Sequence, residues 1–91
     1  MSVKIKISKY LQPKTNGKVI VEVTGSTVHD CIVALIYQYP GLKGEILNGQ
    51  GIILLKWMIY INNKGATTPD ELSDPVEDGD IIELVPLVAG G

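Results

Sequence analysis

The sequence predicts an α+β fold in which one long helix packs on one face of a mixed β-sheet. Three observations predict it: apolar and polar residues alternate near both ends of the chain, one central stretch has helical periodicity, and turn-forming residues separate these segments. The 91 residues, 45% of them hydrophobic, have room for one core. We expect the element order β-β-α-β-β in one domain over residues 1–86, followed by an extended, flexible C-terminal tail over residues 87–91.

The first segment is a strand because its apolar and polar residues alternate, as in a half-buried strand. Asn16-Gly17 then indicates a tight turn, and a valine-rich second strand follows. The two strands are therefore expected to pair antiparallel. The residues expected to face the core are Val3, Ile5 and Ile7 from the first strand and Val19, Val21 and Val23 from the second.

The central segment is an amphipathic helix. Thr27 followed by Asp30 resembles an N-terminal capping pair, and Pro40-Gly41 ends the helix. The glycine-rich residues 42–51 that follow are expected to form a short helical turn and then a mobile loop. The apolar residues at helical spacing are Val28, Cys31, Ile32, Leu35, Ile36 and Tyr39.

Two further strands follow. Residues 56–63 are rich in β-forming residues, and both faces of this strand are apolar, which indicates a central position in the sheet. The last strand alternates Ile82 and Leu84 inward with Glu83 outward, and pairing should end near Pro86. The segment between them is dense in turn formers. The remaining assignments are Trp57, Ile59 and Ile61 on one face of the third strand, Leu54, Met58 and Tyr60 on the other, and Leu72 and Val76 in the core.

Charge is divided along the chain. Residues 1–64 hold all eight lysines and only three acids, whereas residues 65–91 hold seven acids and no base. This acidic stretch is either a set of solvated turns or a surface that docks on a basic partner. Nucleic acid is not expected as a partner because the chain has no arginine. The longest apolar stretch, residues 51–61, is interrupted by Lys56 and is shorter than the roughly 20 residues of a membrane span.

The chain lacks the residue groupings of an enzyme. His29 is the one histidine, no Cys/His cluster has metal-ligand spacing, and the paired carboxylates Asp78 and Asp80 flank a turn glycine. Cys31, the one cysteine, excludes an internal disulfide. The N-terminus has no apolar region typical of a secretory signal, so we expect a cytoplasmic protein that is not an enzyme by itself.

The C-terminus offers one reactive group. The α-carboxylate of Gly91 is ionised at neutral pH, and Gly90 and Gly91 allow the backbone to enter a narrow channel where a Cβ would clash. A carboxylate becomes an acyl donor when ATP converts it to a mixed anhydride with AMP, which requires another enzyme. The activated carbonyl can then accept sulfur or an amine.

Four stretches in order, "YPGL" at 39–42, "YINN" at 60–63, "EDGDIIELVP" at 77–86 and terminal "VAGG", resemble the ubiquitin-like β-grasp sulfur carriers. The likeness is greatest to the MoaD-like small subunit of molybdopterin synthase, with the ThiS-like thiamine sulfur carriers as close relatives. The resemblance implies a β-grasp roll whose Gly91 is adenylated and then carries sulfur as a thiocarboxylate, with Gly90 beside it. The implied partners are a ubiquitin-activating-like adenylyltransferase, which uses ATP, and the large synthase subunit. No stably bound cofactor is implied.

A docking surface for these partners is expected beside the tail and on the open sheet face. For the sheet-face group the alternative is that residues 42–53 cover it. Three other functions stay open: a ubiquitin-like modifier of lysines, a sulfur carrier for thiamine or tRNA thiolation, and a binding module with an inert tail. The predicted docking residues are Val85, Pro86, Leu87, Val88 and Ala89 beside the tail and Leu54, Met58 and Tyr60 on the sheet.

Overall fold

The computed structural model describes residues 2–54, 56–62, 64–67 and 72–86, with the backbone alone for residues 64–67. The elements that lie wholly within these residues follow in chain order. They are β1 (Ser2–Lys6), η1 (Gln12–Thr15), β2 (Ile20–Thr24), α1 (Val28–Gln38), η2 (Pro40–Leu42), α2 (Lys43–Ile46), β3 (Trp57–Ile61), β4 (Lys64–Thr67) and β5 (Ile81–Pro86).

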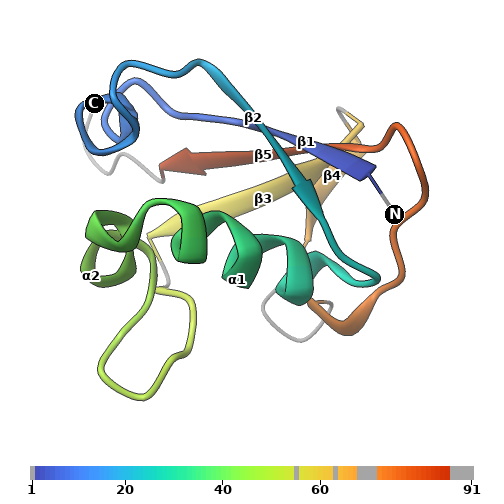
Figure 1. The fold of residues 1–91 in the computed structure, drawn as a ribbon. Coiled ribbons are helices and arrows are strands. Elements are labelled where there is room, and N and C mark those ends of the chain that lie inside the picture. The colour runs from blue at the N-terminus through green and yellow to red at the C-terminus, as the bar shows by residue number, and fades with distance from the viewer. Residues whose placement is uncertain (1, 55, 63, 68–71, 87–91) are drawn as a thin grey trace.

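The strands form one mixed sheet in the order β2-β1-β5-β3-β4. β1 and β5 lie side by side in parallel, and the β1–β2, β3–β5 and β3–β4 pairs are antiparallel. Helix α1 crosses one face of the sheet, with α2 beside one end of it (Figure 1). This architecture confirms the predicted α+β class and its β-grasp arrangement, with one main helix on a mixed sheet.

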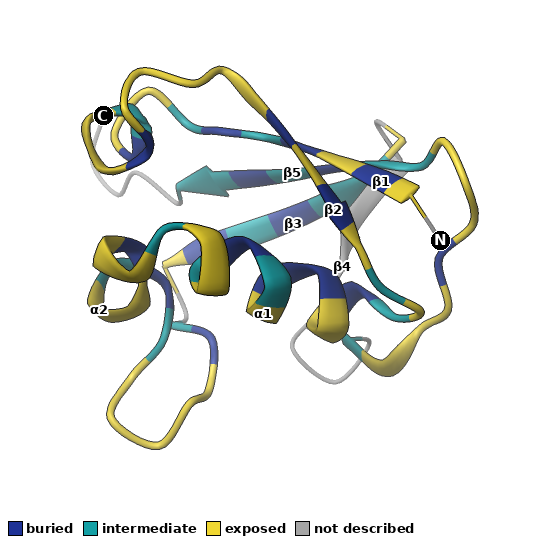
Figure 2. Ribbon diagram, viewed as in Figure 1, coloured by how far each residue is buried: buried dark blue, intermediate teal, exposed yellow. Residues whose placement is uncertain are grey.

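The core lies between α1 and the sheet, and buried residues alternate with more exposed ones along β1 and β2 (Figure 2). Val3, Ile5 and Ile82 are completely buried, and Leu84 is 1% exposed. Val76 is also buried, and Leu72 is partly buried against the same cluster. The predicted inward faces of β1 and β5 are therefore confirmed.

The helix begins and ends where the sequence indicates. The side-chain oxygen of Thr27 accepts a hydrogen bond from the Asp30 backbone N–H at 3.0 Å, which satisfies one of the free donors of the first turn. The helix ends at Gln38, before Pro40-Gly41. Its buried residues are Val28, Cys31, Ile32 and Leu35, while Ile36 and Tyr39 are partly buried against the core.

The prediction of four strands is incomplete, because Lys64–Thr67 adds β4 to the edge of the sheet. Asn62 allows it. Its backbone adopts the left-handed conformation (φ 53°), which asparagine tolerates well, so the chain can turn back along β3. Asn62 also donates its backbone N–H to the Ile81 carbonyl oxygen at 2.8 Å, and its side-chain oxygen accepts the Ile81 N–H at 2.8 Å. A short strand of low β propensity is thus held in place by tertiary bonds.

The start of the second strand is also corrected. Val19 lies outside β2 and is 60% exposed, whereas Val21 and Val23 are buried as predicted. The reason is the connection before it, where η1 and the left-handed residues Asn16 and Gly17 form a longer turn than a two-residue hairpin. Antiparallel pairing therefore begins at Ile20, opposite Lys6.

The glycine-rich segment after α1 contains the predicted helical turn, α2. The residues after it have more regular contacts than a mobile loop suggests. Leu47 and Ile53 form an isolated β-bridge, and the Asn48 side-chain oxygen accepts the backbone N–H groups of Gln50 and Ile52. This local closure puts Ile53 in the core, where it is 3% exposed.

Candidate functional site

The end of β5 is the point where the chain leaves the described fold. Pro86 lies opposite Trp57 in the antiparallel register, and this is the last β3–β5 pair. Proline lacks a backbone N–H, so it cannot donate to a further ladder bond, as predicted. Five of the predicted site residues follow it and lie outside the described residues: Leu87, Val88, Ala89, Gly90 and Gly91.

A hollow of about 450 Å³ lies beside this exit. Trp57, one of the lining residues, is only 7% exposed. Its Nε1–H donates a hydrogen bond to the Glu45 carbonyl oxygen at 2.8 Å. The Lys56 ammonium lies 5.7 Å from the centre of the Trp57 ring, within the range of a cation–π contact. The indole therefore ties α2 to β3 next to the exit. The residues lining the hollow are Tyr10, Leu11, Glu45, Lys56, Trp57 and Pro86.

Three predicted docking residues meet on the sheet face opposite α1. Met58 pairs directly with Val85, and Tyr60 pairs with Glu83, so their side chains share that face. All four are partly exposed. Since the face directed away from α1 is not part of the core cluster, Met58, Tyr60 and Val85 form an accessible apolar strip that leads to the exit.

Leu54 does not belong to that strip. It is partly buried against the core cluster, and its backbone N–H donates to the Ile46 carbonyl oxygen at 2.8 Å. Ile46 and Ile53 are core residues, so this segment packs on the same side of the sheet as α1. The grouping of Leu54 with Met58 and Tyr60 on one face is therefore wrong. So is the alternative in which this segment covers them.

One exposed apolar residue of β2 is not among the predicted site residues. The register places Ile20 opposite Lys6, and it is 49% exposed. Lys6 is in turn aligned with Glu83 of β5. The signal that could have found Ile20 is the alternation itself, because Val21 and Val23 face inward and the intervening positions face outward.

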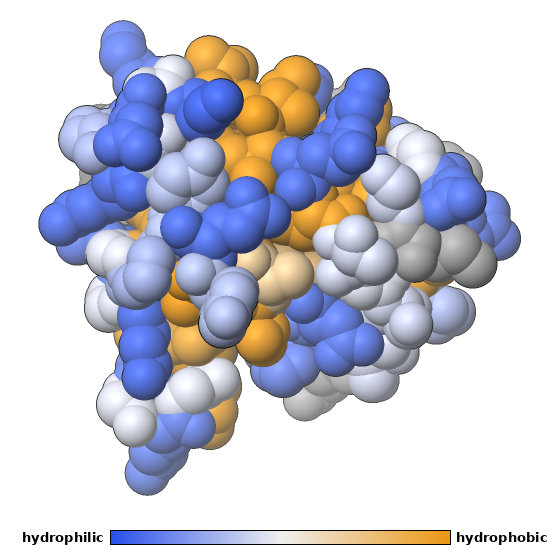
Figure 3. Space-filling model, viewed as in Figure 1, coloured by the Kyte–Doolittle hydropathy of each residue, from blue (hydrophilic) through white to orange (hydrophobic). Residues whose placement is uncertain are grey.

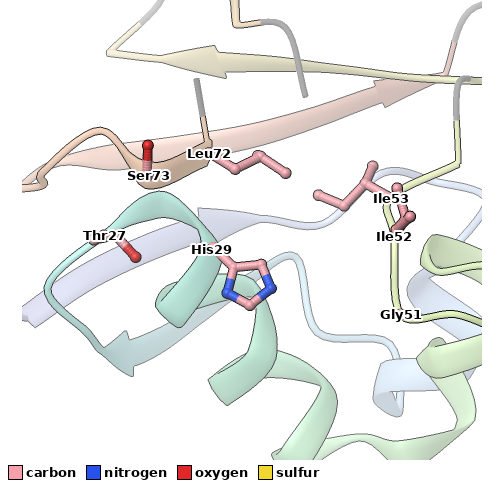
Figure 4. A pocket seen from close by; sticks show the side chains of 7 residues that line it. All are labelled: Thr27, His29, Gly51, Ile52, Ile53, Leu72 and Ser73. Atoms are coloured by element: carbon pink, nitrogen blue, oxygen red, sulfur yellow. The ribbon is translucent and has the colours of Figure 1, made fainter. Parts of the chain in front are cut away.

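A second hollow, of about 520 Å³, lies at the other end of α1. Figure 4 shows His29 from α1, Ile53 from the loop and Leu72 around this space. Thr27 also lines it, but its oxygen already accepts the Asp30 N–H as the helix cap. The other described residues that line the hollow are Gly51, Ile52 and Ser73.

The acidic turn before β5 serves the fold. An Asp78 side-chain oxygen accepts the Ser2 backbone N–H at 2.7 Å. The Asp80 carboxylate accepts the Glu77 N–H at 2.8 Å and a hydrogen bond from the Asn62 amide at 3.1 Å. The Glu77 backbone bond and then the Asn62 bond hold the pKa of Asp80 below its ordinary value. The local backbone bonding expected for Asp78 and Asp80 is thus present.

Among the residues that the structure describes, no three His, Cys, Asp or Glu side chains are grouped as a metal site would require. Of the helices in the described ranges, none has the length and apolar character needed to cross a bilayer.

A small mixed sheet with one crossing helix, whose central strand β5 is followed by a five-residue segment ending in Gly-Gly, defines a ubiquitin-like β-grasp protein. The sequence model of the ThiS family matches residues 5–91, and the chain belongs to that family.

Similar proteins and solved structures support the family assignment. The sulfur carrier protein CysO of Mycobacterium tuberculosis is 29% identical over 93 residues, covering all of both chains. A chain of the Amycolatopsis orientalis BexX/CysO complex superposes with a TM-score of 0.83 at 27% identity, covering 98% of this chain and 99% of that one. SAMP1 of Haloferax volcanii superposes with a TM-score of 0.85 at 26% identity over the full length of both chains.

The molybdopterin-converting factor complex of Helicobacter pylori also contains a similar chain. Its identity is 22% and its TM-score 0.63, with full coverage of both chains. At this identity the likeness is one of fold.

Proposed function

We propose that this protein is a sulfur carrier whose C-terminal Gly91 is activated by adenylation and then holds sulfur as a thiocarboxylate. The single observation that supports it most is the direct continuation of β5, a central strand of the sheet, into the segment that ends in Gly90-Gly91. The family assignment and the relative named as a sulfur carrier support the same chemistry.

The proposed reaction has two steps. A Gly91 carboxylate oxygen attacks the α-phosphorus of ATP, forming the acyl-adenylate and releasing pyrophosphate. Hydrosulfide then attacks the carbonyl carbon, AMP leaves, and one proton is released as the thiocarboxylate forms. A partner adenylyltransferase supplies the nucleotide site, and the role of this chain is to present the carboxylate.

The acceptor of the sulfur is the finer part of the proposal. We propose the precursor of molybdopterin, bound by a large synthase subunit, because the sequence resemblance implies that pairing. The solved BexX/CysO complex shows that a similar chain assembles with a second protein. Thiamine or tRNA thiolation would use the same carrier chemistry with a different acceptor.

A second function, modification of lysines, is favoured by the likeness to SAMP1 of Haloferax volcanii. A second solved structure from that organism gives this name in full, small archaeal modifier protein 1. An amine in place of hydrosulfide would attack the same acyl-adenylate, forming an isopeptide bond and releasing AMP. The two functions therefore share the first step and differ in the nucleophile.

The test is intact-protein mass spectrometry after incubation with the adenylyltransferase, ATP and sulfide. The expected result is exchange of one oxygen for one sulfur, located in the C-terminal peptide. A variant ending at Ala89 is the control and should gain no sulfur. The absence of this exchange in the full-length protein would refute sulfur carriage, while Gly-Gly remnants on lysines of other proteins would establish the modifier function.

A further inference from the structure

The exit end of the fold carries five lysines, contributed by three segments around the point where β5 finishes: the β1–β2 connection, α2 and the residue before β3. All five are exposed. We call this set the lysine collar. Its members are Lys9, Lys14, Lys18, Lys43 and Lys56.

The topology brings these segments together. β1 runs parallel to β5, so the residues after β1 arrive at the end of the sheet where β5 finishes, and Tyr10 lines the exit hollow together with Pro86. η1 lies against η2: a Cβ placed on Gly41 would be 3.6 Å from Cδ of Lys14. α2 contributes Glu45 to the same hollow and begins at Lys43. Figure 1 shows η1 and α2 at this same end.

Charge at the exit is therefore strongly positive. Among the described residues that line the hollow, Glu45 is the one carboxylate and Lys56 the one lysine, and the other four lysines lie on the segments that the topology brings to this end. The acidic turn lies at the opposite end of the sheet, where the Ser2 N–H donates to Asp78 and the Lys4 N–H donates to the Asp80 carbonyl oxygen. Figure 3 shows hydrophilic side chains at both ends of this face and across its middle, with apolar patches among them. The molecule is thus polarised along β5, basic where the chain leaves the fold.

The length of the chain after Pro86 determines what must approach this end. Five residues follow, and fully extended they span at most about 17 Å. Any enzyme that places ATP on the Gly91 carboxylate must therefore lie close to the exit, with its surface facing the collar. Since like charges in that position would repel, the facing surface should be acidic.

We propose that the lysine collar docks on an acidic surface around the channel of the adenylating partner. This inference rests on the proposed function and adds to it the surface that the enzyme recognises. Lysines spread around an exit attract an acidic surface without fixing one bidentate geometry, so their main effect is on the rate of encounter. The acidic turn before β5, which is part of the stretch that the sequence suggested as a docking surface, lies at the end remote from this contact.

The experiment measures ATP–pyrophosphate exchange by the ubiquitin-activating-like adenylyltransferase of the same organism, with this protein as substrate. In the variant K14Q/K43Q we expect kcat/KM at low salt to fall about tenfold while kcat is unchanged, because the loss is in association. The difference should shrink as ionic strength screens the charges. K14R/K43R keeps the charge and should behave like the unsubstituted protein.

A compensated variant separates the collar from net charge. K14Q/K43Q/D74N/E77Q restores the net charge through exposed acids at the far end. Its kcat/KM should stay low if the collar acts locally, and recovery to the original value would overturn the proposal. Circular dichroism checks that each variant is folded.

Two further outcomes have distinct meanings. If the unsubstituted protein supports no exchange, the proposed function fails and the collar's role fails with it. If exchange occurs but is unaffected by K14Q/K43Q, the collar alone is refuted. Fluorescent ATP added without the enzyme provides the last arm: binding that disappears in K14Q/K43Q would assign the collar to nucleotide and overturn its assignment to a protein surface.

Discussion

Replacing Trp57 with phenylalanine tests how the exit is held together. Trp57 is 7% exposed, pairs with Pro86 and donates its Nε1–H to the Glu45 carbonyl oxygen at 2.8 Å. The substitution removes that hydrogen bond, worth about 1 kcal/mol net, and a further share of buried ring surface worth about 1 kcal/mol. We therefore expect Trp57→Phe to lower the free energy of unfolding by about 2 kcal/mol.

The assay is urea and thermal unfolding followed by far-ultraviolet circular dichroism, because the substitution removes the one tryptophan. A loss of this size in a domain of this length lowers Tm by roughly 10 °C. Ile52→Ala, at a position that is 53% exposed, is the control and should change stability by less than about 0.5 kcal/mol. If Trp57→Phe is as mild as this control, the indole does not anchor α2 and the description of the exit is wrong.

Three further predictions concern the body of the fold. Gly25→Ala should lower the free energy of unfolding in urea by about 1–3 kcal/mol, because the new Cβ would lie 2.9 Å from the Cys31 backbone nitrogen and Sγ. The control is Gly44→Ala in α2, where a Cβ meets no atom within 4 Å, so the change should not lower the stability. Because the pKa of Asp80 is lower in the folded state, its contribution to stability is full above its unfolded value of about 3.9 and is lost as pH falls through the folded value. An unfolding series in this acid range should show that loss, and Asp80→Asn should flatten it. Burial, and then the Asp30 carboxylate, raises the pKa of the Cys31 thiol, so iodoacetamide should label native protein slowly; labelling as fast as in urea would contradict this.

The sheet and helix could be predicted because their signals are local. Alternation in β1 and β5 and the capped, periodic run of α1 are each readable within about ten residues, and the core faces follow from them. The placement of Ile82 and Leu84 in the core needed no knowledge of the partner strands. Patterns within one strand or one helix can therefore be read directly from the sequence.

β4 and the side of Leu54 could not be predicted, because distant bonds decide them. Lys64–Thr67 has weak strand character, and it pairs because Asn62 turns the chain and is fastened to Ile81, nineteen residues away. Leu54 continues the apolar phase of Met58 in the sequence, but its bond to Ile46 sets the loop on the core side before β3 begins. A period-two pattern applies only where the backbone is extended, and β3 begins at Trp57, after Leu54.

The two ends of the molecule use their charges differently, and this bears on the two interpretations of the acidic stretch. Asp78 and Asp80 accept backbone N–H groups from β1 and from their own turn, so their carboxylates already have a structural task. The lysines of the collar are exposed at the end where β5 finishes, and β5 is also the strand whose continuation ends in Gly91. Charge near the exit can influence the approach of an enzyme to a terminus at most about 17 Å away, whereas the acidic turn acts from the far end of the sheet, beyond about one screening length at physiological salt. A structural role is therefore sufficient for Asp78 and Asp80, and the collar proposal places the recognition surface among the lysines.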